Sequence, residues 1–346
     1  MPRVSIVIPA HNAARFVGRA IESVREQTYS DWEIVVVDDG SSDDTWELLQ
    51  ASGPRVHSFR REHAGGPAVA RNLALEHAGG ELVAFLDADD LLLPRYLESQ
   101  LAYFDVASES RGASESWGAS NSPAANGSRG ASKSRVASDS QPGAVGLVTC
   151  DARILIDERY APYTHLQTVP GRYAPITLER ELRLNVIYGA CLVPSAVGAA
   201  VGWFDAELFG TEDYGLWIKI LEAGYRAVLN EEVLAVYRRT AGSVSSNIAS
   251  QGLNNRRAYA LALDRGSLTA RQRRIARRAI RYNRAMEEVA LLRFSGARRG
   301  SSALRRLHRL PSLLWVALTN PRMWPEWLQL LRTGQAKDAA ELRAHR

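Results

Sequence analysis

A short, unbroken apolar run that ends in acidic residues limits how this chain can fold. Residues 82–86 (LVAFL) are long enough for one strand buried on both faces, and Asp87, Ala88, Asp89 and Asp90 follow directly. In a continuing strand, side-chain alternation would place Asp87 and Asp89 on the same side. Such a pair suits Mg²⁺ or Mn²⁺, which prefer oxygen ligands. The alternative is that these residues cap a helix beginning near residue 94.

Segments before this run have the alternating strand and helix pattern of a parallel α/β sheet. Residues 4–8 (VSIVI) and 33–37 (EIVVV) predict buried strands, residues 55–59 predict a weaker one, and amphipathic helices are expected between them. Ligands of such sheets gather beyond the carboxyl ends of the strands. Segments 9–12, 38–42 and 87–90 all lie at those ends, so we expect them to meet in one crevice.

Five segments resemble the inverting glycosyltransferases of family 2, which have the GT-A nucleotide-sugar fold, a mixed α/β sheet flanked by helices. The matching sequences are SIVIPAHN, EIVVVDDGSSDDT, GGPAVARNLAL, ELVAFLDADD and GWFDAELFGTEDYGLWIKILEAGY, which occur in the family's order and cover about residues 3–240. The resemblance implies that Asp89 holds the metal and that Asp87 lies near the nucleotide ribose. The implied nucleotide site consists of Pro9, Ala10, Asn12, Asp39 and Arg71.

The chemistry of two of these residues agrees with the implied nucleotide site. A carboxylate such as Asp39 can accept a hydrogen bond from a pyrimidine N–H or a ribose hydroxyl, and Arg71 can bind diphosphate oxygens with its planar fork. The alternatives are an Asp39 that caps a turn and an Arg71 exposed at the start of a helix.

Asp213 matches the catalytic base of the family's Glu-Asp pair. Thr211 is a candidate N-cap of the helix that follows, so Glu212 and Asp213 would lie at its positive end. One such base can take the proton of an attacking hydroxyl, a contribution of roughly 10²–10⁴-fold in rate. The alternative is that the pair only charges a helix N-terminus. Gly215 stands where relatives often have another Asp.

Three further residues are candidates for acceptor or diphosphate contacts. Residues 188–193 (YGACLV) predict a strand in which Gly189 allows close approach of a ligand to the backbone. Many relatives have a His after the strand expected at 233–237, where this chain has Arg238. The candidates are Gly189, Glu212 and Arg238. No Gln-x-x-Arg-Trp follows Asp213, which disfavours a processive polysaccharide synthase.

The predicted catalytic domain, residues 1–245, contains a segment of very different composition. Residues 106–143 consist largely of Ser, Ala and Gly and repeat a six-residue theme, with RGASES, WGASNS, RGASKS and RVASDS. Such a composition cannot bury enough apolar surface to offset the entropy of ordering. We expect a disordered insertion between a helix at 95–104 and a strand at 145–150.

Residues 251–346 are predicted to be a basic, amphipathic helical region. They carry a net charge of +15, against −10 for residues 1–250. Arginines beside Trp and Leu at 304–331 are typical of a surface on anionic lipid. A helical cap with a solvated arginine face is the alternative, and no nucleic-acid partner is expected because no recognised module accompanies the charge.

The sequence predicts a cytoplasmic protein, peripheral on the inner face of the membrane. No apolar run approaches 18 residues, and the two cysteines, Cys150 and Cys191, have no metal or disulfide spacing. We predict a Mn²⁺- or Mg²⁺-dependent inverting glycosyltransferase. It would move one sugar from a nucleotide-diphosphate donor, preferentially a UDP-sugar, to a hydroxyl of a glycan or lipid-linked saccharide in cell-surface polysaccharide biosynthesis.

Two other functions remain open. A sugar nucleotidyltransferase has a similar sheet but usually carries a Gly-rich, basic loop after the first strand, and PAHNAARF has none. A non-catalytic carbohydrate- or lipid-binding scaffold could use the same fold. The presence of Asp89 and Asp213 argues against that scaffold.

Overall fold

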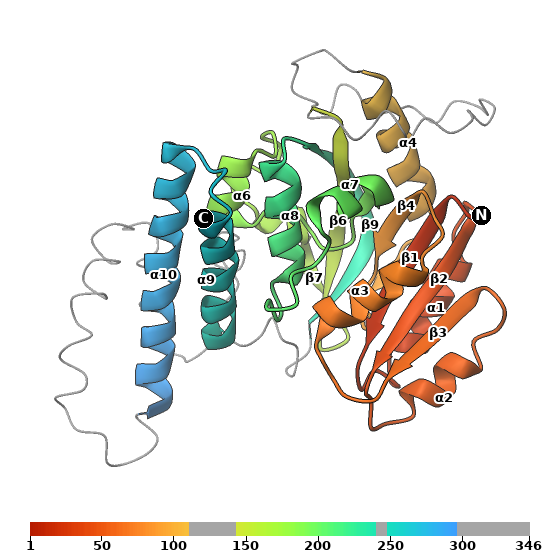
Figure 1. Ribbon diagram of the computed structural model, residues 1–346. Helices are drawn as coiled ribbons and strands as arrows, with labels where there is room; N and C mark the ends of the chain where they lie inside the picture. The colour runs from red at the N-terminus through yellow and green to blue at the C-terminus, as the bar shows by residue number, and fades with distance from the viewer. Residues whose placement is uncertain (111–142, 240–247, 296–346) are drawn as a thin grey trace. The chain divides into compact units, whose positions relative to one another are not determined.

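The computed structural model describes residues 1–110, 143–239 and 248–295, except for the side chains of 248–251 and 285–295. The chain divides into two compact units, Met1–Arg239 and Thr240–Arg346, which are described separately (Figure 1). The predicted catalytic domain ended at residue 245, which lies outside the described residues. Most of the predicted insertion, at 111–142, and the segment 304–331 also lie outside them.

The first part of unit 1 is the predicted parallel sheet. Its strands lie in the order β3-β2-β1-β4, and every neighbouring pair is parallel. Each connection is a helix, because amphipathic segments between buried strands must cover the faces of the sheet. The elements are β1 (Val4–Ala10), α1 (Val17–Arg25), β2 (Trp32–Asp39), α2 (Thr45–Gln50), β3 (Val56–Arg61), α3 (Pro67–His77) and β4 (Leu82–Phe85).

The sheet continues beyond β4 with antiparallel neighbours, so it is mixed. The order runs β4-β8-β6-β9-β5, and β7 pairs with β6; only β6 and β9 run parallel in this part. The strands are β5 (Leu91–Leu92), β6 (Val145–Ile156), β7 (Arg159–Thr164), β8 (Leu192–Pro194) and β9 (Arg226–Arg239).

Two apolar layers, one on each face of the sheet, form the core. Side chains that alternate along β1 divide between them: Ile6 belongs to the layer that includes residues of α1, α2 and α4, and Val7 to the layer that includes residues of α3, α7 and α8. Figure 1 shows where these helices lie. This alternation explains why the β1 and β2 segments read as continuous apolar runs. The remaining helices of this unit are α4 (Tyr96–Glu109), α5 (His165–Thr168), α6 (Leu178–Leu184), α7 (Ser195–Val201) and α8 (Glu212–Glu222).

The structure corrects two predicted boundaries and places one segment for which no element was predicted. Helix α4 runs to Glu109 because Ala107 is fully buried, so residues 106–109 are not part of a disordered insertion. Of the strand predicted at 188–193, only Leu192 and Val193 pair in the sheet, as part of β8, and Gly189 lies in the loop before it. Segment 151–185, which had no clear sequence pattern, continues β6 and forms β7, α5 and α6.

The described part of unit 2 is a pair of helices. Helices α9 (Ile248–Asp264) and α10 (Ala270–Ser295) pack against each other and bury Ala258, Ala262 and Ala276. Both helices fall almost wholly within residues 251–346, the region predicted to be helical. Among the described residues, no helix is both long enough and apolar enough to cross a membrane.

Candidate active site

The loops after β1 and β2 are joined side by side at the carboxyl edge of the sheet. The backbone N–H of Asn12 donates to Ser41 Oγ at 2.8 Å, and the N–H of Ser42 donates back to Asn12 Oδ1 at 2.9 Å. Pro9 and Ala10 end β1 in register with Val37 and Asp38. Two of the three segments predicted to meet in one crevice, 9–12 and 38–42, are therefore adjacent.

Asp39 is buried, at 3% exposure, and fixes the loop after β3. Its carboxylate accepts from the N–H groups of Gly65 at 2.9 Å and Gly66 at 2.7 Å, and it pairs with the Arg61 guanidinium. These donors come from the chain itself. The carboxylate is therefore held at the sheet edge as predicted, and its contact with a nucleotide stays a prediction.

Arg71, on α3, joins two acidic segments that are far apart in sequence. Its Nη1 donates to Glu212 Oε1 at 2.5 Å, and its Nη2 pairs with Asp87. Burial tends to lower the pKa of the Arg71 guanidinium, but the nearby carboxylates of Asp87 and Glu212 outweigh that effect and raise it. The guanidinium is 5% exposed, so the alternative of a surface arginine is wrong. Both terminal nitrogens bind carboxylates, which any diphosphate would have to displace or share.

The acidic segment after β4 forms a turn, which corrects the alternation expected from a continuing strand. The strand ends at Phe85, and the N–H of Asp90 donates to the carbonyl of Asp87 at 3.0 Å. Asp90 is buried and accepts from the Tyr188 hydroxyl at 3.0 Å and the Arg238 N–H at 2.7 Å. Asp90 therefore anchors the turn, and the side chain of Asp87 is 50% exposed.

The donor set at this turn is compatible with a divalent cation. Burial, and after it the repulsion from the neighbouring Asp87 carboxylate, raises the pKa of Asp89 to about 6. A bound cation would relieve that repulsion. Among the described residues, no group of three or more His, Cys, Asp or Glu side chains forms a complete metal site, so substrate oxygens would have to supply further ligands.

Arg238, at the end of β9, supports the acidic turn from the other side. Its Nε donates to the carbonyl of Asp89 at 2.9 Å, and its Nη1 donates to Glu158 at 2.6 Å. The side chain is 3% exposed, so Arg238 is not a solvated surface arginine. The structure places Arg238 beside the turn, and a contact with diphosphate stays a prediction.

Asp213 lies in the first turn of α8. Its Oδ1 accepts from the N–H of Tyr214 at 2.6 Å, and its Oδ2 lies 3.5 Å from the point that a Cβ on Gly189 would occupy. Burial and the adjacent Glu212 raise the pKa of Asp213 to about 7, although Arg71 opposes them. Asp213 thus lies close to Gly189, and the approach of a ligand to the Gly189 backbone stays a prediction. A carboxyl group with this pKa can take up a proton near neutral pH.

The two residues before Asp213 are almost fully buried. Glu212 is 4% exposed, and only its Oε1 has a hydrogen-bond partner among the described residues. Thr211 precedes α8 as predicted, but its hydroxyl forms no capping bond with the helix. Buried polar atoms usually have a hydrogen-bond partner. The Glu212 Oε2 atom and the Thr211 hydroxyl have none among the described residues, so these residues alone do not complete the site.

Sequence analysis missed one carboxyl group near this site. Glu181, on α6, is fully buried; its Oε2 accepts from the N–H of Val186 at 2.9 Å, and its Oε1 has no partner among the described residues. Burial, with a smaller contribution from the charge of Asp213, raises its pKa to about 8. Its sequence context, LERELRL, resembles an ordinary exposed helix and carries no signal of this burial.

Comparison with other sequences identifies relatives over most of unit 1. The profile described as "Glycosyl transferase family 2" matches residues 5–110. The putative teichuronic acid biosynthesis glycosyltransferase TuaG of Bacillus subtilis is 31% identical over 250 residues, which are 71% of this chain and 82% of TuaG. The UDP-Glc:alpha-D-GlcNAc-diphosphoundecaprenol beta-1,3-glucosyltransferase WfgD of Escherichia coli is 44% identical over 100 residues, 29% of this chain and 40% of WfgD.

Solved structures confirm the expected fold. TarS 1–349 from S. aureus, crystallised with UDP-GlcNAc, has a TM-score of 0.57 at 18% identity, over 79% of this chain and 70% of that one. The mannosyltransferase PcManGT from Pyrobaculum calidifontis, in complex with GDP-Man and Mn²⁺, has a TM-score of 0.58 at 20% identity. The match covers 99% of this chain and 86% of PcManGT. These neighbours have the GT-A fold. Because TuaG is 31% identical to this chain and is covered over 82% of its length, the chain belongs to glycosyl transferase family 2.

Proposed function

We propose that this protein transfers one sugar from a nucleotide-diphosphate donor to an acceptor hydroxyl, with inversion at the anomeric carbon. The observation that carries the proposal is the bridge formed by Arg71 between Asp87 and Glu212. It brings the segment proposed to bind the donor next to the residue proposed as base, Asp213. The two functions therefore share one buried, charged site.

Asp213 is the proposed base of the reaction. The acceptor oxygen attacks the anomeric carbon as its proton passes to Asp213, and the bond from that carbon to the nucleoside diphosphate breaks. A single displacement of this kind inverts the configuration. The pKa of about 7 makes Asp213 a stronger base than an ordinary aspartate, yet leaves much of it ionised at neutral pH.

The proposed donor site combines loop and helix residues at the carboxyl edge of the sheet. Asp89 would hold Mn²⁺ or Mg²⁺, and Asp87 would lie near the ribose. When bound, such a cation neutralises charge on the departing diphosphate. Gly189, Glu212 and Arg238 are proposed to contact the acceptor or the diphosphate. The proposed nucleotide contacts are Pro9, Ala10, Asn12, Asp39 and Arg71.

A UDP-sugar donor and a lipid-linked acceptor are the proposed substrate classes. WfgD is named for transfer from UDP-Glc to a diphosphoundecaprenol-linked sugar, and TuaG for teichuronic acid biosynthesis. Both names support a role in cell-surface polysaccharide synthesis. We place the enzyme in the cytoplasm, at an anionic membrane surface that residues 251–346 would contact.

Calorimetric titration with UDP, GDP and dTDP, with and without Mn²⁺, tests the donor site, and turnover of the corresponding sugar nucleotides tests catalysis. We expect Asp213→Asn to abolish transfer but keep metal-dependent binding of one diphosphate. Equal loss of both would contradict the role of Asp213 as base. Absence of any diphosphate binding would favour a non-catalytic scaffold.

A further inference from the structure

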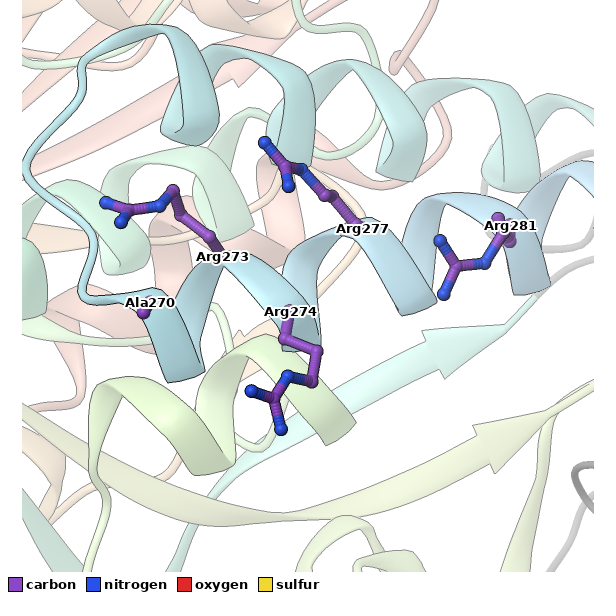
Figure 2. A pocket seen from close by; sticks show the side chains of 5 residues that line it. All are labelled: Ala270, Arg273, Arg274, Arg277 and Arg281. Atoms are coloured by element: carbon purple, nitrogen blue, oxygen red, sulfur yellow. The ribbon is translucent and has the colours of Figure 1, made fainter.

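One face of α10 carries a row of arginines. Figure 2 shows the side chains of Arg273, Arg274, Arg277 and Arg281 projecting from the helix. Together with Ala270 they line a hollow of about 450 Å³. Residues three or four apart on a helix lie on the same face. Their spacing therefore makes the four guanidinium groups one continuous surface, which we call the arginine face.

The arginine face lies opposite the buried side of the helix. Ile275 and Ala276 are buried, at 8% and 0% exposure, and contribute to the apolar side of α10. By contrast, Arg274, Arg277 and Arg281 are exposed. The packing of the α9–α10 pair therefore leaves the arginine face available to a partner.

The sequence around this face is strongly basic. Residues 270–284 contain seven arginines and no Asp or Glu. Within the described parts of the chain, Arg273, Arg274 and Arg277 form no salt bridge with a carboxylate, and Arg273 instead donates to the backbone carbonyl of Leu268. Like charges at this spacing destabilise a helix, so an anionic partner would gain from neutralising them.

The shape of the arginine face suits several phosphates at once. From Arg273 to Arg281 the helix rises about 12 Å, which is longer than one phosphate group. Each guanidinium can bind phosphate oxygens through two parallel hydrogen bonds. We propose that the arginine face of α10 binds the phosphate groups of an anionic lipid surface. This inference rests on the proposed function, because a lipid-linked acceptor would require the enzyme to work at a membrane.

The sequence after α10 favours lipid over nucleic acid as the source of those phosphates. Leu313, Leu314, Trp315, Trp324 and Trp327 follow in the same basic region. Trp and Leu beside basic residues are typical of segments that lie in the membrane interface. Nucleic-acid binding is an alternative outcome that the experiment can detect.

Co-sedimentation of the full chain with phosphatidylglycerol-containing vesicles, and with phosphatidylcholine vesicles, tests the proposal. The variant Arg273→Gln/Arg274→Gln/Arg277→Gln removes three charges from the arginine face. A matched control, Arg19→Gln/Arg159→Gln/Arg183→Gln, removes three charges from exposed positions of unit 1. Thermal melting followed by circular dichroism verifies that both variants fold.

We expect the wild type to bind only the anionic vesicles. A basic residue near such a surface contributes roughly fivefold to binding, so the α10 variant should bind at least about tenfold more weakly. The control should change binding by less than about threefold. Equal loss in both variants, no loss in either, or equal binding to phosphatidylcholine would overturn the proposal. Preference for duplex RNA over anionic vesicles, measured by competition, would also overturn it.

The vesicle assay separates this inference from the proposed function. It contains no sugar donor, and Asp213→Asn should bind vesicles as the wild type does. The α10 variant should still bind UDP with unchanged affinity. Failure of vesicle binding with intact UDP binding would contradict only the lipid inference, whereas failure of UDP binding in the wild type would contradict the proposed function.

Discussion

Arg71 on α3 donates a 2.5 Å hydrogen bond to Glu212 on α8, across 141 residues of sequence. The same guanidinium pairs with Asp87, so one cation holds together the turn after β4 and the start of α8. Both Arg71 and Glu212 are almost fully buried. Removing either partner would leave an uncompensated charge inside the protein.

Arg71→Met should lower the free energy of unfolding by about 3–5 kcal/mol, because Glu212 would stay buried without its cation. Urea denaturation measures the change. Arg183→Met, at an exposed position on α6, is the control and should change stability by less than about 0.5 kcal/mol. A loss for Arg71→Met as small as the control's would show that the bridge contributes little. Arg71→Lys keeps the charge and should recover part of the stability.

The rate of transfer should depend on pH through Asp213. Its pKa of about 7 means that the carboxylate form, which accepts the proton, is lost as pH falls through that value. The pH profile of kcat/KM should therefore show an acidic limb near pH 7. Asp213→Asn should lack both the activity and this limb, and a wild-type limb near pH 4 would contradict the raised pKa.

Glu181 should make the protein less stable as pH rises. Its pKa rises from 4.5 to about 8 on folding, so the folded state holds a proton that the unfolded state has already released. Between about pH 4.5 and about pH 8 the free energy of unfolding should fall by about 1.4 kcal/mol per pH unit from this group. Urea titrations across that range measure the slope.

Glu181→Gln supplies the control for that slope, because glutamine keeps the shape of the protonated acid but does not titrate. The difference in unfolding free energy between wild type and variant should therefore grow with pH. A constant difference would mean that Glu181 ionises normally in the folded protein.

Asp89→Asn should remove the effect of Mn²⁺ on UDP affinity, because an amide binds a divalent cation less well than a carboxylate. Titration with and without EDTA measures this. Asp157→Asn is the control: it removes the same charge from an exposed residue in the β6–β7 turn, whose φ of +46° asparagine tolerates. A retained Mn²⁺ effect in Asp89→Asn would exclude Asp89 as the ligand.

Gly66→Ala should destabilise the loop that holds Asp39. Gly66 has a φ of +90°, and an added Cβ would lie 2.8 Å from the ring of Phe209. The backbone strain should cost about 1–3 kcal/mol. Because the half-exposed Phe209 ring can move aside, adding Phe209→Ala to Gly66→Ala should restore only a minor part of the lost stability. A double-mutant cycle measures that part. Full rescue would mean that steric contact, not φ, determines the cost.

The parallel half of the fold could be predicted from the sequence because its strands are buried on both faces and its helices are amphipathic. Segments 4–8 and 33–37 and the helix that begins at Pro67 all appear in the structure. Segment 151–185 could not be placed, because β7 is largely exposed and α6 is short, so neither has a clear periodicity. The strand predicted at 188–193 was too long because apolar loop residues there are buried by packing rather than by pairing.

The candidate site was predictable in its members but not in their connections. The positions of Asp39, Asp87 and Asp213 at strand and helix ends follow from local patterns. That Arg71 bridges Asp87 and Glu212, and that Asp90 binds Tyr188, depends on contacts between distant segments. Glu181 shows the same limit, because burial of a helical carboxyl group arises from tertiary packing alone.

The hydrogen bonds between Asn12 and the Ser41–Ser42 backbone and side chain make the loops after β1 and β2 one structural unit. An engineer who wishes to change the donor preference by grafting a loop from a relative would therefore have to transplant both loops together. A chimera with a single exchanged loop would lose the reciprocal bonds that hold each loop in place, and its failure would report on loop mismatch rather than on donor choice.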